Sequence, residues 1–332
     1  MRNYFVTGSC GFIGNALCKK LLKNNNNLVI GIDNLSRVGS KNNLKQLVKY
    51  KNFIFFNLDI KNYSSLEKIF SKYKPDILCH LAAQVAVTLS YQDPIRDFNT
   101  NALGTVNLLS LVQKYNKNCF CLYSSSNKVY GKSTFKDPVD ISVIENPHTP
   151  YGVSKFVGDL YFKEFASEEL GLKTCVLKQS CIYGPGQYGI EDQGWLMWFL
   201  LKNYFKGNLK IFGSGRQVRD LLFIDDLIDL YIILINKKIV GSYPLGGGIS
   251  NSLSLNKSIN LIEKVTKNKF RKITYSNFRP GDQHFFVSDN SWLRKFKINW
   301  IPKITPSVGI KEMHSWISIN HKILNKIYGK KL

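Results

Sequence analysis

Near its amino terminus the chain reads TGSCGFIG at residues 7–14. The glycines Gly8, Gly11 and Gly14 have the spacing G-x-x-G-x-x-G. Glycine lets the backbone turn sharply and approach a pyrophosphate, and the free N–H groups of a following helix face the negative charge. A glycine triplet could serve a tight turn alone. Here a short apolar run precedes it and residues 12–22 have helical apolar spacing, so it predicts a dinucleotide-binding βα unit.

Strand-like and helix-like segments alternate through the first half of the chain. The expected buried strands after the first are residues 28–32, 53–56, 77–81, 119–123 and 174–177. Such alternation predicts an α/β fold, a doubly wound parallel sheet of the Rossmann type with a smaller C-terminal α/β domain. We expect residues 1–180 and about 218–245 to form the dinucleotide-binding domain, and residues 181–217 and 246–332 to form a substrate-binding domain.

Carboxylates follow two of the expected strands. Asp33 lies 33 − 8 = 25 residues after Gly8, near the expected place for a carboxylate that holds a ribose diol. It would repel a 2′-phosphate, so NAD is favoured over NADP, although Arg37 is close in sequence. Asp59 could contact adenine or be an ordinary turn residue. The predicted NAD-binding residues are Gly8, Gly11, Phe12, Ile13, Gly14, Asp33, Asn34, Asp59, Ile60, Leu81, Ala82, Ala83, Gln84, Asn99, Ser124, Tyr151 and Lys155.

Tyr151 and Lys155 lie four residues apart in a segment predicted to be helical, so they share one helix face. A phenol titrates near about 10, too high for a base at neutral pH. A neighbouring ammonium and the positive charge of an oxidised nicotinamide would stabilise the phenolate. Tyr151 could then take a hydroxyl proton while the cofactor takes hydride from the same carbon. Ser126, at a serine-rich strand end, could hydrogen-bond the reacting oxygen. Alone, such a Tyr/Lys pair is more often part of a surface helix, but its place after five βα units predicts catalysis.

The composition excludes several other classes of protein. The 332 residues are 44% hydrophobic, which is enough for a large core and excludes wholesale disorder. No apolar run reaches the roughly 20 residues that span a bilayer, and the start of the chain lacks the pattern of a cleavable signal. The formal charge is 46 − 23 = +23, but the basic residues are spread along the chain. We therefore expect surface composition, with no nucleic-acid and no membrane partner.

Seven cysteines occur without a CxxC pair, mostly in apolar stretches. This usage fits buried, reduced thiols and a cytoplasmic location better than a disulfide framework. The five histidines lack the spacing of metal ligands, so no metal is expected.

The glycine turn, Asp33, Ser126, Tyr151 and Lys155 together resemble the extended short-chain dehydrogenase/reductases, the NAD-dependent epimerase/dehydratase family that acts on nucleotide sugars. The resemblance covers nearly the full length. It implies that Ser126, Tyr151 and Lys155 are catalytic and that NAD is the cofactor. It also implies a homodimer or homotetramer, because the helices expected near 95–115 and 151–170 are similar to the family's dimer-forming pair.

Two positions argue against dehydration. Sugar 4,6-dehydratases of the family place Asp and Glu where this chain has Asn127 and Lys128. Neither side chain is a carboxylic acid, so neither can help to expel a hydroxyl in that way.

The later segments resemble relatives that act on CDP-linked 3,6-dideoxyhexoses, above all the stretch EDQGW at 191–195 and RPGDQ at 279–283. Cys181 stands where most relatives have Asn. The resemblance implies inversion at C2, from CDP-paratose to CDP-tyvelose, by transient oxidation and re-reduction, because the C2 proton has no adjacent carbonyl to make it acidic. The expected substrate-binding residues are Asn127, Cys181, Gln193, Arg219, Arg279 and Asp282.

Arg219 and Arg279 are candidates for the diphosphate, because guanidinium groups bind phosphate oxygens bidentately; surface ion pairs are the alternative. A UDP-hexose 4-epimerase, or another nucleotide-sugar epimerase or reductase, is the nearest alternative function. A non-catalytic RNA-binding relative is a more distant one.

Overall fold

The structure is a computed structural model that describes residues 1–132 and 137–329. The chain divides into two compact units. The first unit comprises Met1–Gly131, Ile144–Gln179 and Ile228–Tyr243. The second comprises Lys132–Val143, Ser180–Leu227 and Pro244–Leu332.

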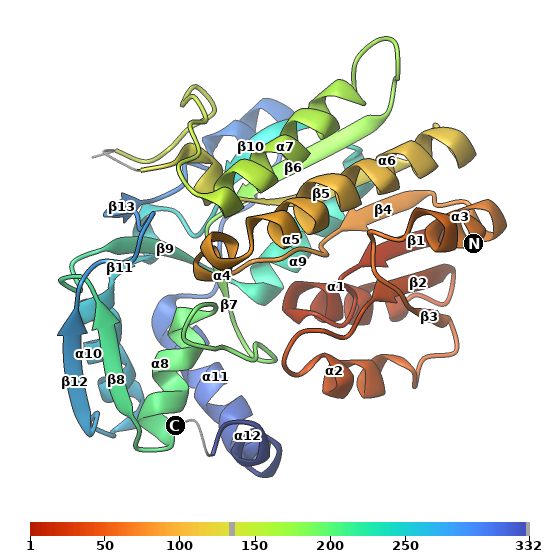
Figure 1. The fold of residues 1–332 in the computed structure, drawn as a ribbon. Helices are drawn as coiled ribbons and strands as arrows, with labels where there is room; N and C mark the ends of the chain where they lie inside the picture. The colour runs from red at the N-terminus through yellow and green to blue at the C-terminus, as the bar shows by residue number, and fades with distance from the viewer. Residues whose placement is uncertain (133–136, 330–332) are drawn as a thin grey trace. The chain divides into compact units, whose positions relative to one another are not determined.

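A seven-stranded sheet forms the centre of the first unit, in the order β10-β6-β5-β4-β1-β2-β3 (Figure 1). Its strands are β1 (Arg2–Thr7), β2 (Asn27–Asp33), β3 (Phe53–Asn57), β4 (Ile77–His80), β5 (Phe120–Ser126), β6 (Lys173–Gln179) and β10 (Gly241–Leu245). Strands β1 to β6 pair in parallel. The order reverses between β1 and β4, which is the switch point where such sheets bind ligands. The predicted doubly wound fold is confirmed.

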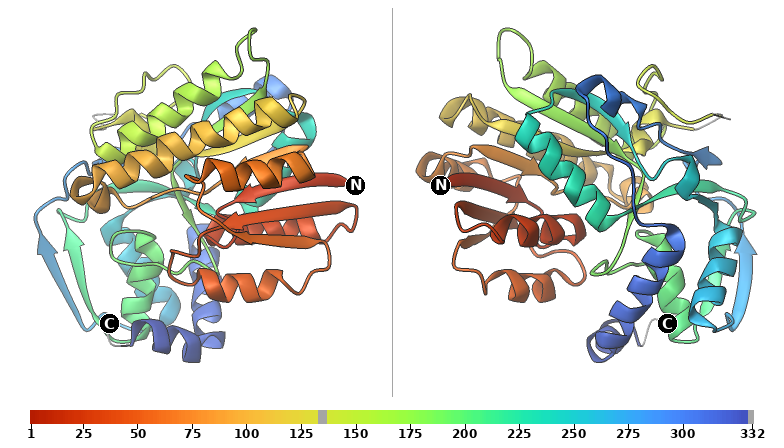
Figure 2. Two further views of the ribbon diagram at one scale, coloured as in Figure 1. Left: turned by 45° about the vertical axis from the view of Figure 1, so that its right-hand side comes forward. Right: turned by 180° about the vertical axis from the view of Figure 1, so that it is seen from behind.

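Helices cover both faces of this sheet. They are α1 (Phe12–Leu22), α2 (Ser40–Leu47), α3 (Tyr63–Tyr73), α4 (Val87–Gln92), α5 (Pro94–Phe98), the π-helix η1 (Asn99–Leu103), α6 (Gly104–Tyr115), the 3-10 helix η2 (Asn127–Tyr130), α7 (Pro150–Glu164) and α9 (Ile224–Lys237). Figure 2 shows α3, α6 and α7 on one face, and α1 and α9 on the other. Phe5, Phe70, Leu108 and Phe162 belong to the buried cluster on the first of these faces. The helix expected from about 95 to 115 is interrupted by η1.

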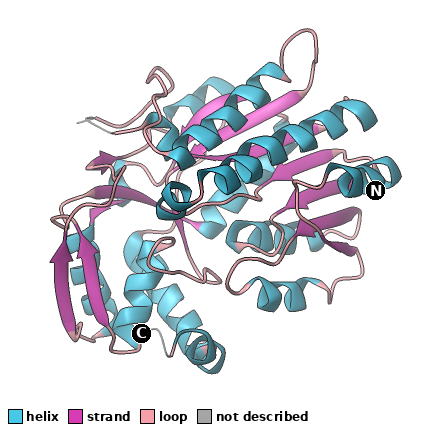
Figure 3. Cartoon of the chain, in the orientation of Figure 1, coloured by secondary structure: helices cyan, strands magenta, loops and turns pink. Residues whose placement is uncertain are grey.

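The second unit contains short strands and several helices. The strands are β7 (Cys181–Tyr183), β8 (Asn208–Phe212), β9 (Val218–Phe223), β11 (Ser252–Ser254), β12 (Lys272–Ser276) and β13 (Phe285–Phe286). The helices are α8 (Trp195–Tyr204), η3 (Ile249–Asn251), α10 (Leu255–Thr266), η4 (Ser291–Phe296), α11 (Pro306–Ile319) and α12 (His321–Tyr328). Strands β8 and β12 pair in parallel as a separate two-stranded sheet (Figure 3).

Strand β9 departs from the expected domain bounds. The sequence pattern predicts residues 218–223 as part of the NAD-binding domain, whereas β9 pairs with β7, β11 and β13. These hydrogen bonds place it in the second unit. The reason is that strand partners are chosen by contacts distant in sequence, which local patterns do not record.

The helices of the described residues are all too short or too polar to cross a membrane. The seven cysteines are free; six are buried and Cys181 is half-buried.

Candidate functional site

The glycine turn joins β1 to α1 at the carboxyl edge of the sheet. Gly8 donates its N–H to Ile32 O at 2.8 Å, and Gly11 donates to Gly8 O at 2.9 Å. Gly8 has φ +69°, and a Cβ on Gly14 would lie 2.1 Å from Gly8 O. The N-cap of α1 is Gly11, which has no side chain to cap the first turn, so the N–H groups of that turn suit an anion. The turn therefore fits the pyrophosphate of a dinucleotide.

Asp33, at the end of β2, is fixed by the same turn. Its Oδ2 accepts the Cys10 N–H at 3.0 Å and its Oδ1 accepts the Leu35 N–H at 2.7 Å. Burial raises the pKa of this carboxyl, and these backbone donors oppose the rise. The carboxylate is thus held at the edge where a ribose would lie.

Two other predicted cofactor residues meet at the next strand end. Asn34 donates its Nδ2 hydrogen to Asp59 Oδ2 at 3.0 Å. The side chain of Ile60, another predicted cofactor residue, is buried in the core, and its Cδ1 would be 2.5 Å from a Cβ on Gly104. Ile60 therefore shapes the packing of α6 against this edge.

The loop after β4 is held by residues that the sequence did not single out. Asn101 accepts the Gln84 N–H at 2.9 Å through Oδ1 and donates to Gln84 O at 3.0 Å through Nδ2. The Gln84 side chain donates to Asp97 Oδ1 at 2.6 Å, so its amide is engaged within the protein. Asn99, which is predicted to bind the cofactor, is half-buried at the start of η1, and Asn101 and Asp97 are buried. A run of three polar residues in an otherwise apolar helix, at 99–101, was the available signal.

The structure brings Ser126 and Tyr151 together. Pro150 is the first residue of α7, and the Thr149 hydroxyl caps this helix by accepting the Gly152 N–H at 2.9 Å. Burial raises the pKa of Tyr151 to about 12, and a hydrogen bond with Ser126 opposes this rise. The phenol is therefore neutral at physiological pH unless another positive charge stabilises the phenolate.

Lys155 lies one turn further along α7 and is buried. Its Nζ donates to Ser124 O at 2.8 Å and lies 4.0 Å from the centre of the Tyr123 ring. Burial lowers the pKa of this amine, and the carboxylates of Asp159 and Asp97 raise it. Ser124 thus holds the lysine through its backbone oxygen.

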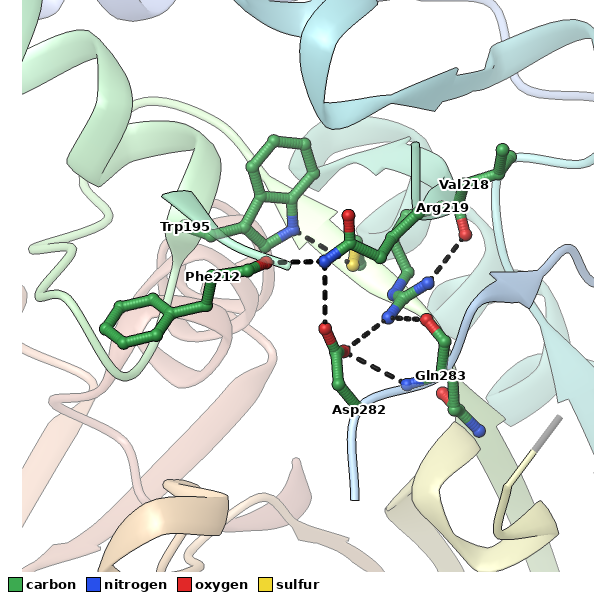
Figure 4. A network of polar contacts seen from close by, with 8 residues as sticks. Trp195, Phe212, Val218, Arg219, Asp282 and Gln283 are labelled. Carbon is green, nitrogen blue, oxygen red and sulfur yellow. Dashed lines mark hydrogen bonds and ion pairs between the residues drawn. The ribbon is translucent and has the colours of Figure 1, made fainter. Parts of the chain in front are cut away.

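In the second unit, the buried Arg219 forms an ion pair with Asp282, whose side chain is half-buried (Figure 4). Arg219 Nη2 donates to Asp282 Oδ1 at 2.7 Å and to Gln283 O at 2.5 Å, and Nη1 donates to Val218 O at 2.7 Å. Gln217 Nε2 donates to Asp282 Oδ2 at 3.2 Å. Three protein oxygen atoms therefore accept hydrogen bonds from the two Nη atoms of this guanidinium.

Arg279 is more accessible, with 24% of its side chain exposed against 8% for Arg219. Its guanidinium carbon lies 4.0 Å from the centre of the Phe212 ring, and Nη2 donates to Glu191 O at 3.0 Å. The nearest carboxylate oxygen, on Asp192, is 3.5 Å away. Arg279 retains donors for an anionic ligand.

The other expected substrate residues lie in both units. Cys181 Sγ accepts the indole N–H of Trp195 at 3.3 Å (Figure 4). Gln193 exchanges backbone hydrogen bonds with Ile190 across a tight turn. Asn127 is buried in the first unit, next to Ser126. The predicted set is thus divided between the units, with Asn127 in the first and the other five in the second.

A glycine turn, a carboxylate at the second strand end and a Ser–Tyr–Lys set on a doubly wound sheet define a dinucleotide-dependent redox enzyme fold. The chain belongs to the NAD dependent epimerase/dehydratase family, whose model matches residues 4–246. Its cofactor is NAD, as the glycine turn and Asp33 predict. The predicted family is also confirmed.

Particular relatives differ in their reactions. The chain is 38% identical to the CDP-paratose 2-epimerase of Salmonella typhi, over 94% of this chain and 98% of that protein. It is 31% identical to a putative UDP-glucose 4-epimerase of Methanocaldococcus jannaschii, over 96% and 99% of the two chains. Among solved structures, UDP-glucuronic acid 4-epimerase of Bacillus cereus, in complex with UDP-glucuronic acid and NAD, is similar with a TM-score of 0.84 at 27% identity, over 96% and 99%.

Proposed function

We propose that this chain is a nucleotide-sugar epimerase that inverts C2 of CDP-paratose to give CDP-tyvelose. The observation that carries the proposal is the meeting of Ser126 and Tyr151 one turn before the buried Lys155. The similarity to the Salmonella enzyme supports the choice of substrate and carbon.

In this reaction Tyr151 takes the proton of the C2 hydroxyl and later returns a proton to the same oxygen. NAD, when bound, would supply the acceptor for the hydride of C2 and the donor that returns it. Inversion then requires the 2-keto sugar to turn in the site so that its other face receives the hydride. Ser126 donates a hydrogen bond to the reacting oxygen. The ammonium of Lys155 stabilises the Tyr151 phenolate, which burial alone disfavours.

The same set of residues supports epimerisation over dehydration. Asn127 and Lys128 follow Ser126 in η2, where a dehydratase needs acid and base carboxyl groups. An amide and an ammonium cannot supply both roles. The 2-keto sugar therefore retains its other hydroxyl groups and is reduced again.

For the substrate, we assign the diphosphate to Arg279, which has spare donors on a partly exposed guanidinium. Arg219 and Asp282 orient each other and the Gln217 amide. The remaining assignments, to Cys181 and Gln193, rest on the resemblance of their sequence segments.

The proposed assembly is a homodimer or homotetramer. Apolar side chains are exposed on neighbouring helices of the first unit: Tyr91 of α4, Ile95 and Phe98 of α5, and Leu160 and Tyr161 of α7. Such a patch is typical of a subunit interface. The free, mostly buried thiols support the proposed cytoplasmic location.

Deuterium at C2 of CDP-paratose tests the chemistry. We expect the label to be retained in CDP-tyvelose, because hydride leaves and returns without exchange; loss of the label to solvent would contradict internal hydride return. Tyr151→Phe, incubated in parallel, is the control for the chemical step.

A second candidate is a UDP-hexose 4-epimerase, which the Methanocaldococcus relative favours. The catalytic set is compatible with either sugar carbon. A panel of CDP- and UDP-sugars separates the candidates: turnover of UDP-glucose without turnover of CDP-paratose would replace the first proposal by the second.

A further inference from the structure

His80 is a fully buried histidine that the proposed reaction does not use. It is the last residue of β4, directly before the loop Leu81–Gln84. Its Nδ1 lies 2.8 Å from Thr7 Oγ1, and its Nε2 lies 2.9 Å from Thr105 Oγ1. The two hydroxyls determine which ring nitrogen carries a proton.

The Thr105 side fixes Nε2. Thr105 Oγ1 lies 2.6 Å from Asn101 O, and a carbonyl oxygen can only accept. The hydroxyl proton of Thr105 is therefore used in that bond. The contact between Thr105 and His80 then requires a proton on Nε2.

The Thr7 side fixes Nδ1 independently. The N–H groups of Leu81 and Ala82 both donate to Thr7 Oγ1 at 3.2 Å, and Leu81 N–H is shared with Thr7 O. With its lone pairs so used, the Thr7 hydroxyl donates its proton to Nδ1. Both sides thus select the neutral ring with the proton on Nε2.

The groups that this ring joins belong to the cofactor and catalytic elements. Thr7 precedes the glycine turn and holds the start of the loop, Leu81 and Ala82. Asn101 holds the end of the loop at Gln84, and its Nδ2 also donates to Ser154 Oγ at 3.0 Å.

Ser154 is the neighbour of Lys155 on α7. One continuous path of hydrogen bonds therefore runs from β1, through His80, to the helix of the proposed base.

We propose that His80 is a positioning residue that, as the neutral Nε2–H tautomer, locks the loop Leu81–Gln84 and the π-helix to each other. The position of the cofactor loop then depends on the bond between His80 and Thr7. The position of α7 depends on the bond between His80 and Thr105. The second dependence rests on the proposed function, whereas the first rests on NAD binding alone.

The charge environment agrees with a neutral ring. The imidazole stacks on the Tyr123 ring with centroids 5.0 Å apart, and Lys155 Nζ lies 4.0 Å from the centre of that same ring. A second positive charge here would repel the lysine. Burial and Lys155 keep the pKa of His80 well below its ordinary value.

Long-range ¹H–¹⁵N correlation NMR tests the tautomer in the NAD-loaded protein. We expect one imidazole with protonated Nε2 and bare Nδ1 that does not titrate near neutral pH and is absent from His80→Asn. The exposed His321, changed to Asn, gives the matched control, which retains this signal. A protonated Nδ1 on His80 would overturn the assignment.

Two variants of His80 separate the effect of its bond to Thr7 from that of its bond to Thr105. His80→Gln places an amide near the Nε2 position, toward Thr105, and removes the acceptor for Thr7. His80→Asn places an amide oxygen near the Nδ1 position and removes the donor to Thr105. Thr7→Val and Thr105→Val break the same bonds from the other side with little change of shape.

We expect NAD affinity, measured by calorimetry on folded protein, to fall about 10- to 100-fold in His80→Gln and Thr7→Val. We expect His80→Asn and Thr105→Val to bind NAD more tightly than His80→Gln and Thr7→Val do. Their loss of activity should appear in kcat rather than in KM. Wild-type NAD affinity in His80→Gln, or a lower Tm with affinity and kcat unchanged, would overturn the proposal. Because NAD affinity and the NMR signal need no sugar, they stand even where the proposed substrate fails.

Discussion

The Asp159 carboxylate lies one helical turn after Lys155 on α7, buried, with neither oxygen hydrogen-bonded to any residue that the structure describes. Burial raises the pKa of Asp159, and the charges of Lys178 and Lys155 lower it. The Ser125 hydroxyl also lowers it, from a position without hydrogen-bond geometry. Because burial lowers the pKa of Lys155 and Asp159 raises it, each side chain favours the charged form of the other.

Asp159→Asn tests this relationship through the pH dependence of turnover. Without the carboxylate, the pKa of Lys155 falls further, so the amine loses its proton at lower pH. We expect the basic limb of the kcat profile to move to lower pH, with about tenfold or greater loss near pH 8. Glu67→Gln, which removes the carboxylate of a surface ion pair with Lys114, is the control with an unchanged profile. An unshifted basic limb in Asp159→Asn would show that Lys155 does not depend on it.

Tyr151→Phe removes the proposed base without changing the shape of the site. Turnover should fall about 100- to 10,000-fold, while NAD affinity stays near that of the wild type. Since burial raises the pKa of Tyr151 to about 12, the wild-type-minus-variant absorbance near the phenolate band should be absent at neutral pH without NAD. With the positively charged nicotinamide bound, the phenolate absorbance should appear at a lower pH than it does in the protein without NAD. Full activity in the variant would remove Tyr151 from the reaction.

Alanine substitutions at Arg219 and Arg279 should have different effects, the first on stability and the second on substrate binding. Arg219→Ala removes a buried guanidinium and leaves the half-buried Asp282 without its ion-pair partner, so we expect about 1 to 3 kcal/mol of lost stability, seen as a lower Tm. Arg279→Ala removes donors from a partly exposed guanidinium, so the KM for the nucleotide sugar should rise about 10- to 100-fold with little change in Tm. Arg279→Lys keeps the positive charge but lacks the paired donors of a guanidinium, so its KM should lie between those of the wild type and Arg279→Ala. A stable Arg219→Ala protein with a selective loss of substrate binding would reverse the two roles.

Thiol accessibility gives a prediction independent of any substrate. Cys181 is half-buried, whereas the other six thiols are buried and burial raises the pKa of Cys10 and Cys175 to about 12. Because thiolates are the reactive form, an aromatic disulfide reagent should titrate Cys181 slowly in the native protein and all seven cysteines after unfolding. Cys181→Ser should abolish the native reaction. Rapid reaction of several thiols in that variant would contradict the packing of the sheet.

The local features were predictable from the sequence. The glycine turn, Asp33 and the Ser126–Tyr151 pair depend on residues placed at strand ends and helix starts, and short-range patterns record these positions. The parallel sheet follows from the alternation of elements. The family and the cofactor followed from the same residues.

The other features of the site depend on a break in the helical repeat and on contacts between residues that are distant in sequence. Helical periodicity cannot register a π-helix, so the contacts of Asn101 with the loop after β4 were not predictable from it, and Asn99 stays a predicted cofactor residue. The side-chain amide of Gln84, a predicted cofactor residue, donates to Asp97, thirteen residues away in sequence. The ion-pair partner of Arg219 is Asp282, 63 residues further along the chain. Short-range sequence patterns do not predict contacts between residues so far apart in the chain.

The division into units has a consequence for how this enzyme can be altered. The chain passes from one unit to the other after residues 131, 143, 179, 227 and 243, and α9 begins in the second unit and ends in the first. Neither unit is a contiguous fragment, so neither can be cut out at one boundary or exchanged with that of a relative by a single crossover. Chimeras intended to transfer sugar specificity therefore need several matched junctions.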